Sequence, residues 1–168
     1  MRMRKLTYTA MWLAVGVALA YLFHLLNLGR MFLPLHLVAM LAGATSGAFV
    51  GGVTGAVLPI LSFLTMGMPP FPMFLFMIPE VFTYGFVMGV MKKNIFVRIL
   101  IAVVLGRLVY SVSYYVLGAL IGIKLQPLTS ILLSFTTGIP GIVLQFILVP
   151  LVYRRLQLIF EKGGKENA

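Results

Sequence analysis

Acidic residues are nearly missing from this 168-residue chain, and aspartate and cysteine are missing altogether. Three Glu face thirteen Lys and Arg. Without cysteine, the chain has no disulfides, no thiolate metal sites and no Cys nucleophile. Without Asp, it cannot build the carboxylate–metal clusters of phospholipid-synthesising membrane enzymes. Only 10% of the residues are charged, against about a quarter in soluble domains, which excludes an ordinary water-soluble enzyme.

The sequence motifs of common nucleotide-binding and hydrolytic sites are absent as well. No G-x-x-x-x-G-K-[ST], G-x-S-x-G or H-E-x-x-H occurs, so neither a P-loop nor these hydrolase or zinc-protease signatures are present. His24, His36 and Glu80 match no known metal-ligand spacing. We therefore expect a protein that binds, conducts or carries a solute, with no enzymatic activity, no cofactor and no metal. Uphill transport would draw its energy from partner proteins or an ion gradient.

Long apolar runs dominate what is present. Apolar residues make up 61% of the chain, and the mean hydropathy is +1.09. A membrane-spanning helix needs roughly 20 mostly apolar residues. The first apolar run exceeds the usual 7–15-residue core of a signal peptide and lacks a small-x-small cleavage site, so we keep it in the mature protein. We expect one all-α membrane domain, residues 1–168, with six transmembrane helices at about 8–26, 32–47, 50–66, 72–91, 95–123 and 127–153.

The distribution of positive charge predicts the orientation. Ten of the thirteen basic residues precede the first span, separate the fourth from the fifth, or follow the sixth. Arg30 and Lys124 lie on the other side, and Arg107 lies inside a span. Cytoplasmic segments carry the excess of Lys and Arg, so both termini are expected in the cytoplasm. This topology explains the basic excess without a nucleic-acid partner.

Small residues recur at intervals of four in two places. Ala10, Ala14 and Ala18 share one face of the first helix, which favours close approach of another helix. That helix could belong to the same chain or to a partner subunit. A second ladder, in GATSGAFVGGVTG, predicts tight packing of the second helix against the third; its members are Gly43, Gly47, Gly51 and Gly55.

Ionisable groups inside spans mark candidate functional sites. At 1.5 Å per residue, His36 lies roughly 6 Å and Glu80 roughly 12 Å below the outer surface. Arg107, Tyr110 and Tyr114 share one helix face, as do Phe76, Met77, Glu80 and Tyr84. Two interpretations stay open: Glu80 and Arg107 pair to hold the bundle together, or these stripes line a pocket for a small ligand. The stiff, uncharged segment 67–72 could cap such a pocket.

Several segments together resemble the substrate-binding S components of energy-coupling factor (ECF) vitamin transporters. The likeness covers the basic N-terminus, RKLTYTAMWLAVGVALA, LAGATSGAFVGGVTG, LTMGMPP and the six-helix count. It implies a multi-pass protein of the prokaryotic cell (inner) membrane that captures a vitamin or precursor with high affinity from outside. It also implies docking, through Ala10, Ala14 and Ala18, on a transmembrane coupling subunit driven by two ATPase subunits.

Two substrates are favoured by this resemblance. The pattern FLPLHL…GMPPFPM…E…GRLVY is similar to a branch for cobalamin lower-ligand precursors such as dimethylbenzimidazole or its riboside. Pantothenate carriers are also similar. A flat neutral aromatic would stack on aromatic side chains while Glu80 accepts a hydrogen bond, whereas a carboxylate would need Arg107 unpaired. The predicted substrate-binding residues are His36, Phe71, Phe74, Glu80, Tyr84, Arg107, Tyr110 and Tyr114.

Two functions of other classes remain as alternatives. The chain could be a stand-alone small-solute channel or secondary carrier, with Arg107 lining a path and Glu80 relaying protons. It could also be a purely structural assembly subunit, which would bind no small molecule.

Overall fold

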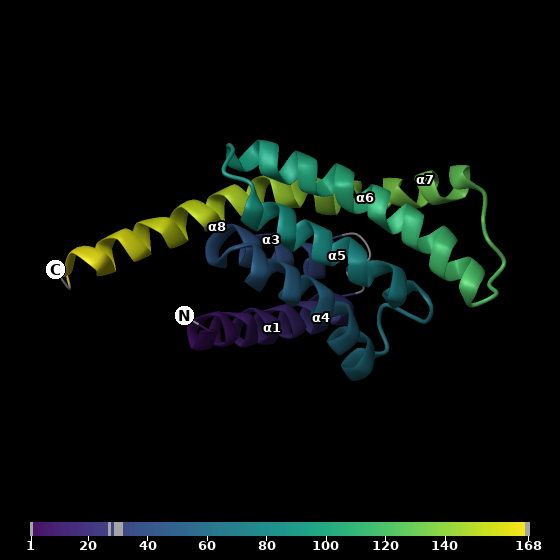
Figure 1. The fold of residues 1–168 in the computed structure, drawn as a ribbon, viewed down its shortest axis with the longest axis horizontal. Coiled ribbons are helices and arrows are strands. Elements are labelled where there is room, and N and C mark those ends of the chain that lie inside the picture. The colour runs from purple at the N-terminus through teal and green to yellow at the C-terminus, as the bar shows by residue number, and fades with distance from the viewer. Residues whose placement is uncertain (1, 27, 29–31, 167–168) are drawn as a thin grey trace.

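The fold is a bundle of helices, seen in a computed structural model that describes residues 2–26, 28 and 32–166 (Figure 1). No strand occurs among these residues. Arg30, one of the charges expected on the outer side, lies outside them. The helices are α1 (Arg2–Leu25), α3 (Pro34–Ser46), α4 (Ala48–Met66), α5 (Met73–Val90), α6 (Ile95–Leu120), α7 (Leu128–Thr136) and α8 (Ile139–Glu166).

Five of the described helices are long and apolar enough to cross a membrane: α1, α4, α5, α6 and α8. The exception among the expected spans is α3, an apolar helix of 13 residues. The start of α1 and the end of α8 lie at the same end of the bundle (Figure 1). The six-span count and the cytoplasmic termini stay predictions.

The region expected as one span over 127–153 contains two helices, α7 and α8, separated at Thr137 and Gly138. Pro140 explains the interruption, because proline lacks the N–H that would bond to the Thr136 carbonyl four residues earlier, and its ring clashes with that carbonyl in a continuous helix. Proline is well accommodated in the first turn of a helix, which is where α8 holds it. The apolar segment long enough to cross a membrane runs over Ile139–Leu158.

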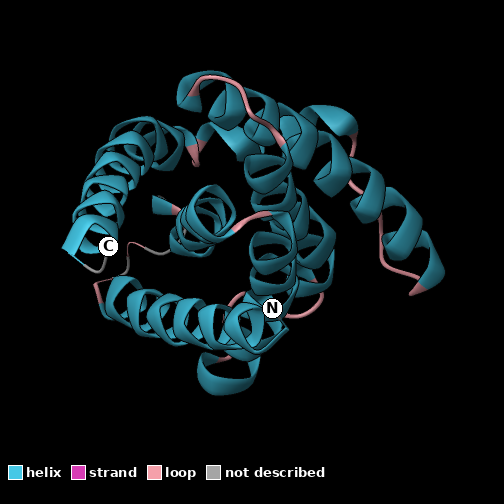
Figure 2. Cartoon of the chain, turned by 60° about the vertical axis from the view of Figure 1, so that its left-hand side comes forward, coloured by secondary structure: helices cyan, strands magenta, loops and turns pink. Residues whose placement is uncertain are grey.

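α3 occupies the centre of the bundle. Ten consecutive residues, from Pro34 to Gly43, are buried. Figure 2 shows the other helices ringed around it. A helix buried on every side must be apolar all round, and the sequence PLHLVAMLAGATS meets this condition with His36 as its one ionisable group.

Glycines let α3, α4 and α5 approach until their backbones touch. A Cβ on Gly51 would clash with the backbones of Gly43 and Gly85, and a Cβ on Gly55 would clash with that of Val81. The predicted close packing of the second and third apolar segments is therefore confirmed. α5 adds glycines of its own to this seam, since a Cβ on Gly89 would clash with Ala48.

Polar contacts fix the helix ends. The Trp12 indole N–H donates to the Ser46 hydroxyl at 3.2 Å, which joins α1 to the end of α3. The Ser62 hydroxyl donates to the Met68 carbonyl at 2.6 Å and fastens the segment between α4 and α5. The buried Arg98 guanidinium donates to the Met88 carbonyl in the last turn of α5, where a cation also complements the helix dipole.

Candidate functional site

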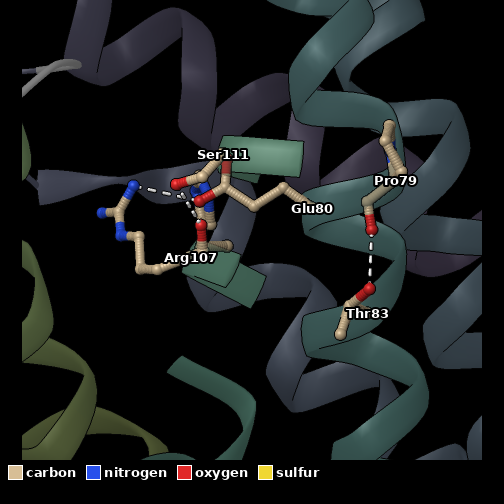
Figure 3. Close-up of polar contacts among 6 residues, drawn as sticks. Pro79, Glu80, Thr83, Arg107 and Ser111 are labelled. Atoms are coloured by element: carbon tan, nitrogen blue, oxygen red, sulfur yellow. Dashed lines mark hydrogen bonds and ion pairs between the residues drawn. The ribbon is translucent and has the colours of Figure 1, made fainter. Parts of the chain in front are cut away.

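Three helices bring three ionisable side chains together, with His36 and Arg107 both beside the Glu80 carboxylate. Glu80 on α5 is 1% exposed. Its Oε1 accepts a hydrogen bond from Arg107 Nη1 of α6 at 3.0 Å and lies 3.3 Å from His36 Nε2 of α3. Figure 3 shows the Glu80 side chain directed toward Arg107, while Pro79 and Thr83 lie on the other side of α5. The expected Glu80–Arg107 pair is therefore formed, with His36 beside it.

Tyr84 closes the side of this cluster nearer the end of α5, one helical turn along from Glu80. It is fully buried, and its ring meets the His36 ring edge-on with centroids 4.8 Å apart. The absence of a side chain at Gly106 leaves room for the Tyr84 ring against α6. Its hydroxyl has no hydrogen-bond partner among the described residues.

Aromatic rings line the side of the cluster nearer the start of α5. Phe76, one turn before Glu80, makes edge-to-face contacts with Tyr110 and Tyr114, with centroids 6.3 and 5.3 Å apart. Tyr110 in turn contacts Phe135 of α7 at 5.9 Å. The Arg107 guanidinium carbon lies 4.7 Å from the centroid of the Phe135 ring, a cation–π arrangement. The Glu80–Arg107 pair is thus enclosed by aromatic surface.

Tyr114 also anchors the connection between α6 and α7. Its hydroxyl accepts a hydrogen bond from the backbone N–H of Gln126 at 2.9 Å. The Tyr115 hydroxyl donates to the backbone carbonyl of Gln126 at 3.1 Å. The Tyr114 ring remains in contact with Phe76. Tyr114 therefore joins the aromatic wall to the segment that leads into α7.

Phe71 and Phe74 form a separate aromatic cluster. The Phe74 ring stacks on Phe63 of α4, with centroids 4.2 Å apart and planes 9° apart, and Phe71 lies 6.4 Å from it. Phe74 precedes Phe76 by two residues, so it points to a different side of α5. The structure brings together His36, Glu80, Tyr84, Arg107, Tyr110 and Tyr114, but not these two phenylalanines.

The sequence-based set omitted two residues of the aromatic wall. Helical spacing placed Phe76 on the same face as Glu80 and Tyr84, but the list of predicted binding residues left it out. Phe135 could not be found this way, because its position depends on the break between α7 and α8. The part of the chain that the structure describes contains no group of three or more His, Cys, Asp or Glu side chains that could hold a metal ion.

A second feature lies on the outside of α1. Ala10, Ala14 and Ala18 are all exposed, so packing within the chain does not account for their spacing. Ala14 and Ala18 line an open apolar groove of about 620 Å³ between α1 and α4. Its other lining residues are Leu13, Val17, Tyr21, Leu61, Thr65 and Met66.

Comparison with known protein families gives one match. The model of the ECF transporter substrate-specific component family matches residues 4–153. No curated protein and no solved structure gave a significant match. The match spans nearly all of the described helices, including the charged cluster and the exposed alanines. The chain therefore belongs to the family of ECF transporter substrate-specific components, which makes it a substrate-binding subunit for membrane transport and not an enzyme.

Proposed function

We propose that the chain captures a small, neutral, aromatic vitamin precursor of the cobalamin lower-ligand type. The observation that carries this proposal is the engagement of Arg107. Its guanidinium donates to Glu80 at 3.0 Å and lies over the Phe135 ring. The charge balance of the site is therefore met before any ligand enters, and aromatic rings supply most of the surface around it.

The same observation weighs against pantothenate. A carboxylate ligand is best recognised by a guanidinium that is free for bidentate pairing, and here Arg107 would first have to leave Glu80. The pantothenate carboxylate would also bring a second negative charge next to Glu80, which is 1% exposed. Like charges at short range in a poorly solvated site repel strongly. A neutral aromatic ring avoids both penalties and gains edge-to-face contacts with Phe76, Tyr110 and Tyr114.

The expected topology places this site toward the outside of the cell. With both termini in the cytoplasm, α5 enters the membrane from the outer side at Met73. Glu80 then lies seven residues, or about 10 Å, along the helix. The ligand would enter from the outer surface, between the 67–72 segment and the α6–α7 connection.

The exposed alanines provide the surface for the partner. We propose that the groove between α1 and α4 receives an apolar helix of the transmembrane coupling subunit, which works with two ATPase subunits. Ala14 and Ala18 keep this surface low enough for helix backbones to approach. The groove is separate from the Glu80 cluster, which lies between α3, α5 and α6.

A thermal-shift measurement on the detergent-purified chain tests the ligand class. Dimethylbenzimidazole, its riboside and pantothenate are each added at increasing concentration. A ligand at 1,000 times its Kd adds about 4 kcal/mol to the free energy of unfolding, so the true substrate should raise Tm clearly. We expect the base or its riboside to do so and pantothenate not to.

Three other outcomes would contradict the proposal. Stabilisation by pantothenate alone would mean that Arg107 exchanges Glu80 for the ligand carboxylate. No stabilisation by any of the three, with the protein demonstrably folded, would exclude the proposed substrate class. Uptake by the chain alone, without a co-expressed ATPase module, would favour the channel or secondary-carrier alternative.

A further inference from the structure

Gln145 is a buried amide without a hydrogen-bond partner. It is 0% exposed, and neither its Nε2 nor its Oε1 is hydrogen-bonded in the described part of the chain. Leaving a buried polar group unpaired destabilises a protein, and the hydrocarbon region offers no water to compensate. The position of Gln145 in the bundle should therefore explain why its amide is left unpaired.

Gln145 lies on a buried face of α8. A Cβ on Gly138 would lie 3.0 Å from Arg107 Nη2 and 3.4 Å from Leu33, so this side of the chain meets α6 and the start of α3. Gln145 follows Gly138 by seven residues, which is nearly two turns and returns to the same face. Val149, one turn further, is also fully buried. This stripe therefore faces the interior of the bundle.

A second contact fixes the level of Gln145 along the bundle. The Arg98 guanidinium of α6 lies 5.6 Å from the centroid of the Tyr153 ring of α8, and the two helices run in opposite directions. Gln145 precedes Tyr153 by eight residues, and Gly106 follows Arg98 by eight. This contact places Gln145 near the level of Gly106 and the Gly138–Arg107 approach places it near residue 100, so Gln145 lies beside residues 100–106 of α6. Gly106 is the residue against which the Tyr84 ring packs.

Gln145 therefore lies at or below the level of Tyr84, beneath the Glu80–Arg107 pair, and both residues carry unpaired polar atoms. An amide offers a donor and an acceptor side by side, and a phenol offers one more of either. This combination suits the polar edge of a heterocycle that bears a ring N–H and an unprotonated ring nitrogen. The benzimidazole ring has both.

We propose that Gln145 is a specificity-determining residue, which hydrogen-bonds the nitrogen-bearing edge of an aromatic heterocycle at the inner end of the site. This inference rests on the proposed function. It adds a residue of α8 to a site otherwise built from α3, α5, α6 and α7. It also gives the amide a role that its burial in an apolar helix otherwise lacks.

The test compares Gln145→Met with Thr54→Val, using dimethylbenzimidazole as the probe. Methionine keeps the length and shape of glutamine without the amide. Thr54 is a matched control, because its hydroxyl is equally buried and unpaired but lies on α4. Affinity is measured by calorimetry, and Tm is measured without ligand. We expect Gln145→Met to bind the probe about tenfold more weakly, the ratio typical of one buried hydrogen bond, with an equal or higher ligand-free Tm. Thr54→Val should leave the affinity unchanged.

Distinct results separate the inference from the proposed function. Wild-type protein that binds no probe would overturn both. Wild-type binding with unchanged affinity in Gln145→Met would overturn the inference alone, as would a fall in its ligand-free Tm, because the amide would then have a partner within the chain. If Gln145→Met does not fold, Gln145→Leu is measured in its place under the same criteria.

Discussion

At the scale of single residues, one carboxylate organises the site. Glu80 is the acidic group to which both Arg107 and His36 are directed. Burying an ion pair removes both charges from solvent, and the attraction between them has to offset that loss. Arg107 keeps 17% of its side chain exposed, which lessens the loss on its side. The Glu80 carboxylate is not exposed to solvent in this way. Its negative charge therefore depends on its partners for stabilisation.

Replacing Glu80 by Gln tests whether the carboxylate also contacts the ligand. We expect binding to weaken by about 1–3 kcal/mol, the range for a lost buried hydrogen bond to a charged group, together with a lower Tm because Arg107 loses its partner. Calorimetry and thermal unfolding measure the two effects. Thr83→Val is the control, since Thr83 lies on the other side of α5 and donates to the Pro79 carbonyl. A lower Tm with unchanged affinity would restrict Glu80 to a structural role.

The charged residues of the site could be found from the sequence, whereas several of its apolar and neutral residues could not. Charges inside spans are rare enough to be noticed one by one, and this selected His36, Glu80 and Arg107. Phenylalanine is common in such helices, and Phe74, predicted as a stacking surface for an aromatic ligand, stacks on Phe63 of α4 instead. Gln145 is not among the residues predicted to bind substrate, and its lack of a hydrogen-bond partner is visible only in three dimensions.

At the scale of helices, the glycine seam explains the tightest packing in the molecule. Gly51 of α4 lies against Gly43 of α3 and Gly85 of α5. In a membrane, helices associate through close packing rather than through a hydrophobic driving force. The seam holds α3 and α5 in register, and this register sets His36 beside Glu80.

The variant Gly85→Ala should destabilise the protein more than Gly16→Ala. A methyl group at position 85 meets the Gly51 backbone, which cannot move aside, whereas at position 16 it meets the flexible end of the Leu58 side chain. Overpacking typically lowers the free energy of unfolding by about 1–3 kcal/mol, and we expect Gly85→Ala at the upper end. Thermal unfolding of both purified variants checks this order. Equal Tm values would mean that the helices separate easily at the seam.

The sequence predicted the helices well where apolar runs ended at clear signals and less well elsewhere. Gly47 and Gly67, both with positive φ, mark the ends of α3 and α4 within a residue of the expected boundaries. The run after residue 127 lacked charges to divide it, so one span was expected where α7 and α8 occur. The shortness of α3 was also missed, because hydropathy reports composition and not the position of a helix in the bundle.

At the scale of the whole molecule, the proposed ligand site and the alanine groove lie on different helices. The first is built on α3, α5, α6 and α7, and the second on α1 and α4. Capture of a ligand and contact with the coupling subunit can therefore be altered separately.

The variant Ala14→Leu should abolish transport by the assembled complex and leave the ligand affinity of the isolated chain unchanged. A larger side chain fills the groove and keeps a partner helix at a distance. Uptake assays and calorimetry provide the two readouts. Ala119→Leu adds the same bulk to an exposed position of α6 and should affect neither. Loss of both transport and ligand binding in Ala14→Leu would mean that Ala14 contributes to the stability of the chain itself.

The position of α3 has a consequence for the dependence of this protein on its lipids. At 13 residues it is about 20 Å long, and its buried length faces other helices rather than acyl chains. Hydrophobic mismatch therefore acts on the outer helices, which respond by tilting, while the glycine seam holds α3 to α5. We expect ligand affinity to be nearly the same in bilayers of short-chain and long-chain lipids, as equilibrium binding to reconstituted protein would measure. A steep dependence of ligand affinity on acyl length would show that α3 moves together with the helices around it.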